Sequence, residues 1–213
     1  MHQTPWKKSR TFGDLHGGRT RRRWTDNIVA RTHSLPLPGP DDAMPVLIEE
    51  NPSRRFVFPV SVATCAEALR RLPPDHTDGL THLWLRALPA RLVVPETPWA
   101  LYVAGSGVRA IVLHPWGKVG RRWNETRPPS PTLQASFQRF GGRMVRTRAG
   151  WDAVFPDPHD LARFYLEHLL GHEVGHHVAW YVQGLRQNTR QAEDFADDYA
   201  RRWGPVLSAV LNG

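Results

Sequence analysis

The stretch EHLLGHEVGHHVAW, residues 167–180, places imidazoles and carboxylates inside an apolar run. An α-helix turns by about 100° per residue, so His172 and His176 lie one turn apart on one face and can close on a single metal ion. Glu173 lies beside that face, within reach of a water molecule bound to the ion. This His-Glu-x-x-His order is typical of a zinc site in which the glutamate is the general base. The spacing therefore predicts a metal centre on this helix.

Two further histidines of the stretch are not expected to bind the same ion. His168 lies one turn before His172, but it is roughly 12 Å along the helix axis from His176, whereas zinc–nitrogen bonds are about 2 Å long. A His168–His172 pair stays an alternative, although it lacks a well-placed base. His177 points away from the metal face, and we expect it at the surface or supporting a ligand, with a substrate contact as the alternative.

A catalytic zinc needs a third protein ligand, and the next helical segment offers one. The sequence TRQAEDFADDYARRW places Glu193 and Asp197 one turn apart on a single face. Glu193 can complete the ligand set, and Asp197 can accept the free ring N–H of a zinc-binding histidine. Ala196 keeps the contact face small, and Gly175 on the first helix lets a neighbouring segment approach closely. The alternative is an ordinary solvated helix whose acidic N-terminal half suits the helix dipole.

HEVGH followed by EDFAD resembles the signature of the gluzincin zinc metallopeptidases, His-Glu-x-x-His and then Glu-x-x-Ala-Asp. The resemblance covers roughly residues 55–204, and its specific part is residues 160–202. The chain is similar to the compact soluble members, in which an edge strand of the sheet pairs with the extended substrate. The resemblance implies that His172, His176 and Glu193 bind one Zn²⁺. It also implies that Glu173 is the catalytic base and that Asp197 is the carboxylate that supports a ligand histidine.

The activity implied is hydrolysis of peptide bonds in a protein or peptide substrate by a zinc-activated water, with Glu173 as general base. The oxyanion of such a reaction needs a hydrogen-bond donor, and Tyr199, Tyr181 and His177 are the candidates. Two other classes stay open: a basic nucleic-acid-associated protein with a structural zinc site, and a catalytically idle interaction module. The intact Glu173 favours the enzyme, because a structural site has no use for a base.

The elements that must position these residues follow from periodicity and from turn residues. The pattern predicts a small sheet followed by helices. The resemblance implies an α+β, zincin-like domain in which this small mixed β-sheet packs on the active-site helix and on the helix after it that carries the third ligand. Strands are expected at RFVFPV, THLWLRAL and GGRMVRTRAGWDAVF, and in two runs joined by a Gly-rich turn, WALYVA and VRAIVLH. Helices are expected at SVATCAEALRRL, from about residue 158 to 182, and from about residue 188 to Trp203, with a loop at VGRRWNETRPPSPT.

The N-terminal residues 1–52 are polar, basic and rich in proline, which predicts a flexible arm and linker ahead of a domain at 53–213. Residues 1–35 hold eight basic and two acidic residues in a chain of net charge +8. Such asymmetry suits an anionic partner, and it makes a DNA-tethered peptidase a further alternative. The candidate nucleic-acid contacts are the cluster Arg21, Arg22, Arg23 and Trp24. The competing interpretation is a solvated arm without a partner.

Cysteine content and hydropathy indicate the cellular compartment of the protein. The single cysteine, Cys65, excludes an internal disulfide and a cysteine-based zinc site, and its apolar neighbours predict core packing. The N-terminus lacks the apolar core of a signal peptide, and no apolar run approaches the roughly 20 residues of a membrane span. We therefore expect a cytoplasmic protein with no membrane partner.

Overall fold

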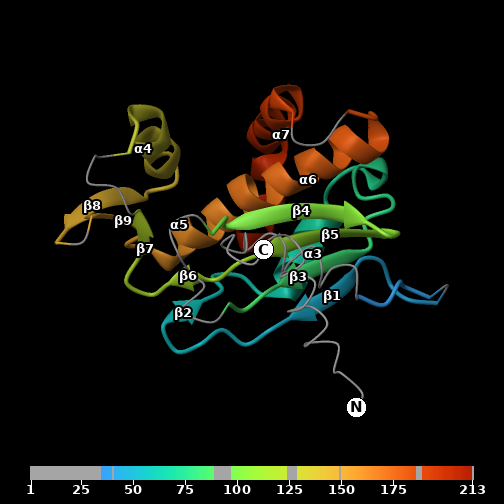
Figure 1. Cartoon of the computed structure of the whole chain (residues 1–213), viewed down its shortest axis with the longest axis horizontal. Helices are drawn as coiled ribbons and strands as arrows, with labels where there is room; N and C mark the ends of the chain where they lie inside the picture. The colour runs from blue at the N-terminus through green and yellow to red at the C-terminus, as the bar shows by residue number, and fades with distance from the viewer. Residues whose placement is uncertain are drawn as a thin grey trace, which may run out of the picture.

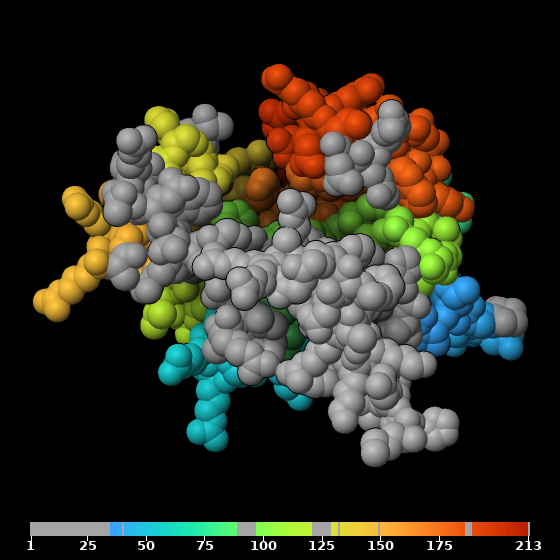
Figure 2. Space-filling view, viewed as in Figure 1, coloured from blue at the N-terminus to red at the C-terminus, as the bar shows by residue number. Residues whose placement is uncertain are grey.

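A computed structural model of the chain describes residues 35–39, 41–88, 97–123, 129–148, 150–185 and 189–212. These segments combine helices with small β-sheets, which confirms the α+β class (Figure 1). In the space-filling view, a hollow separates the lobe that carries helix α4 (Pro131–Gln138) from helix α7 (Arg190–Ser208) (Figure 2). Within the described segments, no helix is both long enough and apolar enough to cross a lipid bilayer.

The largest sheet has four strands in the order β1–β3–β5–β4, with bounds Val46–Glu49, His82–Leu85, Val108–Leu113 and Ala100–Gly105. Strands β1, β3 and β5 run parallel, whereas β4 runs antiparallel to β5. The strand expected at THLWLRAL forms as β3, and all four of its residues are buried, so it is an inner strand covered on both faces. Strand β4 is an edge strand, and it lies beside helix α6 (Gly171–His177) (Figure 1).

The first half of the domain confirms two predicted elements. Helix α3 (Val62–Arg70) begins at Ser61, whose side chain accepts the N–H of Thr64 and caps the helix. Cys65 on this helix is fully buried, and burial raises the pKa of its thiol to about 12, so it is a core residue. The Gly-rich turn between β4 and β5 also forms, with positive φ at Ser106 and Gly107.

Strand β1 lies inside the range 1–52 that the sequence assigned to the arm and linker. It is nevertheless part of the sheet, because it pairs in parallel with β3 and the N–H of Val46 donates to the Thr81 carbonyl at 2.8 Å. The neighbouring prolines made this short apolar run resemble a linker, and the pairing partner is distant in the sequence. Residues 1–34 of the predicted arm lie outside the described residues.

A smaller lobe combines helix α4 with a three-stranded antiparallel sheet (Figure 1). The sheet order is β7–β9–β8, with bounds Arg121–Trp123, Gly150–Val154 and Arg143–Thr147. Strands β8 and β9 pair antiparallel and both lie in GGRMVRTRAGWDAVF, where one or two strands were expected. Strand β7 and the start of α4 fall in a stretch predicted to be a loop. Helix α4 had a local signal, because Ser130 caps it and Pro131 occupies its first turn. The predicted strand RFVFPV reduces to β2 (Phe56–Val57), paired with β6 (Trp116–Gly117).

One helical run extends from Pro158 to Val182, as predicted. It begins at Asp157, which caps the N–H of His159 at 2.8 Å. Helix α6 occupies its centre and is flanked by two π-helical segments, η3 (Phe164–Leu170) and η4 (Val178–Val182). Such widened turns occur frequently at functional sites. The central α-helical geometry keeps residues four apart on one face.

Helix α7 starts at Thr189, as predicted, but it does not end at Trp203. It continues through Gly204 and Pro205 to Ser208. Tertiary packing outweighs these helix breakers, because Leu207 is fully buried and the Ser208 hydroxyl donates to Glu167 at 2.7 Å. The glycine is itself needed there, since a Cβ at position 204 would lie 2.9 Å from the Glu167 carbonyl oxygen.

The two helices that carry the predicted metal ligands, α6 and α7, meet through small residues. A Cβ added at Gly175 would lie 2.7 Å from the Ala196 Cα, and one at Gly171 would lie 3.3 Å from the Ala200 Cα. We call these contacts, together with the approach of Gly204 to η3, the small-residue seam. Because side chains are nearly absent from it, the backbones of α6 and α7 approach one another directly. The expected role of Gly175 and Ala196 is thereby confirmed.

An aromatic cluster joins the smaller lobe to the helical run. Phe164 on η3 is fully buried at its centre. Its ring packs within 6 Å of the rings of Trp99, Trp116, Phe137, Phe140, Phe155 and His168. Because Phe137 of α4 and Phe155, which directly follows β9, both contact this one side chain, the position of the lobe is coupled to that of the helical run.

Replacing Gly175 with alanine tests the seam. In an unconstrained helix this change would add up to about 1 kcal/mol of stability. Here the new methyl group would overlap the Ala196 backbone, so we expect the free energy of unfolding to fall by about 1–3 kcal/mol. Urea unfolding of the metal-free protein measures it. Gly171→Ala, with a wider gap of 3.3 Å, is the control and should cost less. Unchanged or increased stability of Gly175→Ala would rule out the close approach.

Candidate metal centre

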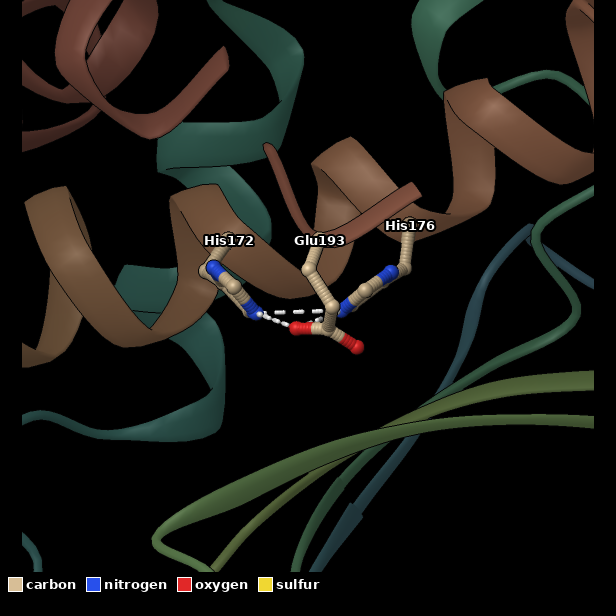
Figure 3. A group of neighbouring side chains, drawn as sticks. All are labelled: His172, His176 and Glu193. Atoms are coloured by element: carbon tan, nitrogen blue, oxygen red, sulfur yellow. Dashed lines mark hydrogen bonds and ion pairs between the residues drawn. The ribbon is translucent and has the colours of Figure 1, made fainter. Parts of the chain in front are cut away.

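Three side chains from two helices converge on one point (Figure 3). His172 and His176 project from successive turns of α6, and Glu193 projects from the first turn of α7. The two Nε2 atoms are 3.0 Å apart, and each lies 3.6 Å from the same Glu193 carboxylate oxygen. The structure thus brings together the three residues that the sequence predicts as ligands.

The geometry of these three atoms fits a zinc ion. With bonds of about 2.0–2.1 Å, neighbouring ligand atoms of a tetrahedral zinc are roughly 3.3 Å apart. The observed separations of 3.0 and 3.6 Å lie on either side of that value. Two imidazole nitrogens and one carboxylate oxygen also leave a fourth position for water, as in catalytic zinc sites. His168 takes no part, because its ring packs against Phe164 and its centroid is 6.3 Å from that of His172.

Asp197 orients the first histidine, as predicted. Its carboxylate lies 2.9 Å from Nδ1 of His172, which leaves Nε2 facing the other ligand atoms. Burial alone would lower the pKa of His172. The hydrogen bond to Asp197 and the nearby charges of Glu173 and Glu193 outweigh burial and raise that pKa. A carboxylate that holds the second ring nitrogen is the usual support of a zinc-binding histidine.

Glu173 is only 6% exposed and lies beside strand β4, in a cavity whose lining does not include Asp197. Burial raises the pKa of its carboxyl to about 7, while His172 and a backbone hydrogen bond from Tyr102 act in the other direction. A cavity of about 290 Å³ opens between this carboxyl and β4, lined also by Pro98 and Ala100. The candidate base therefore shares a cavity with the ligand histidines and with an edge strand.

His177 is fully buried, so the expectation of a surface position was wrong. Its Nε2 lies 2.8 Å from the Asp78 carbonyl oxygen, which can only accept a hydrogen bond, so Nε2 carries the proton. Nδ1 then accepts from the Tyr102 hydroxyl at 3.1 Å. Burial lowers the pKa of His177, which keeps the ring neutral. Tyr102, which the sequence reasoning missed, therefore contacts α6 twice, through its backbone N–H at Glu173 and through its hydroxyl at His177.

The other two candidate oxyanion donors are engaged elsewhere. The Tyr199 hydroxyl lies 2.7 Å from Nδ1 of His76, the last residue of the short 3-10 helix Pro74–His76. The Tyr181 ring stacks on His177, and the Arg109 guanidinium lies 4.6 Å from the centre of the Tyr181 ring. His177 itself is saturated by its two partners. None of the three predicted donors is directed at the ligand group.

Comparison of the chain with protein-family models, with curated proteins and with solved structures finds no match. The candidate nucleic-acid contacts, Arg21, Arg22, Arg23 and Trp24, lie outside the described residues, and the arm's role stays a prediction from the sequence.

Zinc analysis of purified variants tests the ligand assignment. We expect one zinc per chain, lost in His176→Ala and retained in His168→Ala, which removes a neighbouring histidine outside the ligand group. Asp197→Asn should retain the metal with about 10–100-fold weaker affinity, because it removes only the orienting carboxylate. A wild type without metal after zinc loading, or equal losses in the two histidine variants, would contradict the assignment.

Proposed function

We propose that the chain is a zincin-like, gluzincin-type zinc metallopeptidase that hydrolyses peptide bonds of a protein or peptide substrate. The observation that supports it most is the position of Glu173. This buried carboxyl lies between the ligand histidines and the edge strand β4, with its pKa raised to about 7. A structural metal site gains nothing from such a group, whereas hydrolysis needs a base at this place.

Zinc bound by the three ligands would lower the pKa of a coordinated water and polarise the substrate carbonyl. Glu173 accepts the proton of the attacking water and returns it to the leaving amine. Burial raises the pKa of this carboxyl above that of an exposed glutamate, which makes it a stronger base for the proton of the water. The hydrogen bond from the Tyr102 backbone holds the carboxyl in place.

The substrate is positioned by β4 in this proposal. An edge strand presents backbone N–H and C=O groups that have no partner in the sheet, and an extended peptide can add to it as a further strand. Leu101 and Tyr102 of β4 line the cavity that also holds Glu173 and the ligand histidines. A peptide paired with β4 would therefore carry its carbonyl groups past the ligand atoms.

Glu173→Gln separates catalysis from metal binding. The amide keeps the size of the carboxyl but cannot accept a proton, so we expect zinc content and folding to be unchanged and hydrolysis to fall by about 10²–10⁴-fold. The measurement is cleavage of an unstructured protein such as casein, with zinc determined in parallel. Glu67→Gln, an exposed change on α3, serves as the control.

The pH profile gives a second readout of the same assignment. Protonated Glu173 cannot act as base, so the wild-type rate should fall toward acid pH. A bound cation lowers the pKa of a nearby carboxyl, so the acidic limb should lie below the value of about 7 found for the metal-free site. Equal hydrolysis by wild type and Glu173→Gln would exclude Glu173 as the base.

A further inference from the structure

A second cavity, of about 220 Å³, lies one helical turn from the metal centre. It occupies the space between α7 and the end of α4, with η3 beneath it, and Figure 2 shows a hollow between the α4 lobe and α7. Its polar wall contains two carboxylates, two guanidinium groups and one imidazole, from Glu167, Asp197, Arg139, Arg201 and His168. We call it the Arg139 pocket.

The two carboxylates of the pocket already have partners. Glu167 is buried and accepts hydrogen bonds from the Ser208 hydroxyl at 2.7 Å and from Nε of Arg163 at 3.2 Å. Asp197 accepts the His172 ring N–H at 2.9 Å. A cationic ligand would therefore compete with interactions inside the protein for both groups.

The donors of the pocket are less committed. Among the described residues, no carboxylate lies within ion-pair distance of Arg139, whose guanidinium lies 5.3 Å from the centre of the Phe140 ring. Within the part of the chain that the structure describes, Arg201 forms one ion pair, with the exposed Asp198 one turn back on its own helix, and its charge also helps to lower the pKa of Asp197. His168 forms no hydrogen bond to another described residue, and its ring packs against Phe164. The donor groups of the pocket are thus free to bind a ligand, whereas its two carboxylates already accept hydrogen bonds within the protein. This arrangement favours an anionic ligand.

We propose that the Arg139 pocket binds a carboxylate of the substrate, with Arg139 as the principal contact. The carboxylate can come from an Asp or Glu side chain or from the end of the peptide chain. That the carboxylate belongs to a peptide rests on the proposed function. The His168 and His172 rings are 6.3 Å apart, and an extended peptide advances about 3.3 Å per residue. The preferred acidic group therefore lies within about two residues of the scissile bond.

Peptide binding to the zinc-loaded Glu173→Gln protein tests the pocket without cleavage. The probes are three fluorescent pools of random hexapeptides. In the first pool, half of the residues are Asp or Glu and the chain end is amidated. The second pool has Asn or Gln in place of Asp or Glu and is also amidated. The third pool has the same residues as the second, but its C-terminal carboxylate is free. Fluorescence anisotropy gives the affinity of each pool.

Three changes are made in that background. Arg139→Glu reverses the charge of the pocket, and Arg139→Lys keeps it. Arg143→Glu reverses an exposed charge on β8 of the same lobe, outside the pocket lining, and controls for the overall charge. Zinc content, thermal unfolding and hydrolysis by the otherwise wild-type chain are measured in parallel.

We expect the acidic pool to bind about fivefold more tightly than the amide pool. This preference should disappear in Arg139→Glu and persist in Arg139→Lys and Arg143→Glu. A free-terminus pool that binds like the acidic pool would identify the chain end as the source of the carboxylate. Equal binding of all pools, or an equal loss in Arg143→Glu, would overturn the pocket. If the protein hydrolyses peptides but binds acidic ones no better, the pocket proposal is wrong and the peptidase proposal stands. If it prefers acidic peptides but does not hydrolyse them, only the peptidase proposal is wrong.

Discussion

The close approach of two helix backbones is the constraint on which the candidate site depends. Zinc-ligand geometry requires the Glu193 oxygen within a few ångströms of two imidazoles on another helix, and the side chains are too short to span an ordinary helix separation. Gly175 against Ala196 and Gly171 against Ala200 remove the side chains that would hold the helices apart. Glu193 and Asp197 then lie beside α6 because they flank the seam on α7. The predicted ligand geometry therefore depends on the close packing of α6 against α7 in the small-residue seam.

Helix α6 is fixed from two sides, and each side supplies a different part of the chemistry. On the side of α7, Glu193 approaches both histidines and Asp197 orients His172. On the side of the sheet, Tyr102 contacts Glu173 through its backbone and His177 through its hydroxyl. The ligand set is thus built between two helices, whereas the candidate base is built between a helix and an edge strand. Burial between these layers also raises the pKa of the Glu173 carboxyl.

The parts of the site that were predictable are those set by local periodicity. His172, Glu173 and His176 follow from one helix, and Glu193 with Asp197 follows from the next, because residues four apart share a face. The partners of His177 could not be predicted, since they depend on how β4 and the turn at Asp78 pack against α6. The same holds for β1, whose partner strand is distant in the sequence, and for the end of α7. There the burial of Leu207 and the contact of Ser208 with Glu167 outweigh Gly204-Pro205.

Zinc K-edge X-ray absorption of the zinc-loaded protein tests the central claim most directly, because it reports the atoms bound to the metal. The account predicts a four-coordinate ion with two imidazole nitrogens and with oxygen atoms from Glu193 and water, at about 2.0–2.1 Å, and no sulfur. Glu193→Gln should alter the oxygen shell while the two-imidazole signal persists. A spectrum with three imidazoles, or one of fully hydrated zinc, would contradict a centre built from His172, His176 and Glu193.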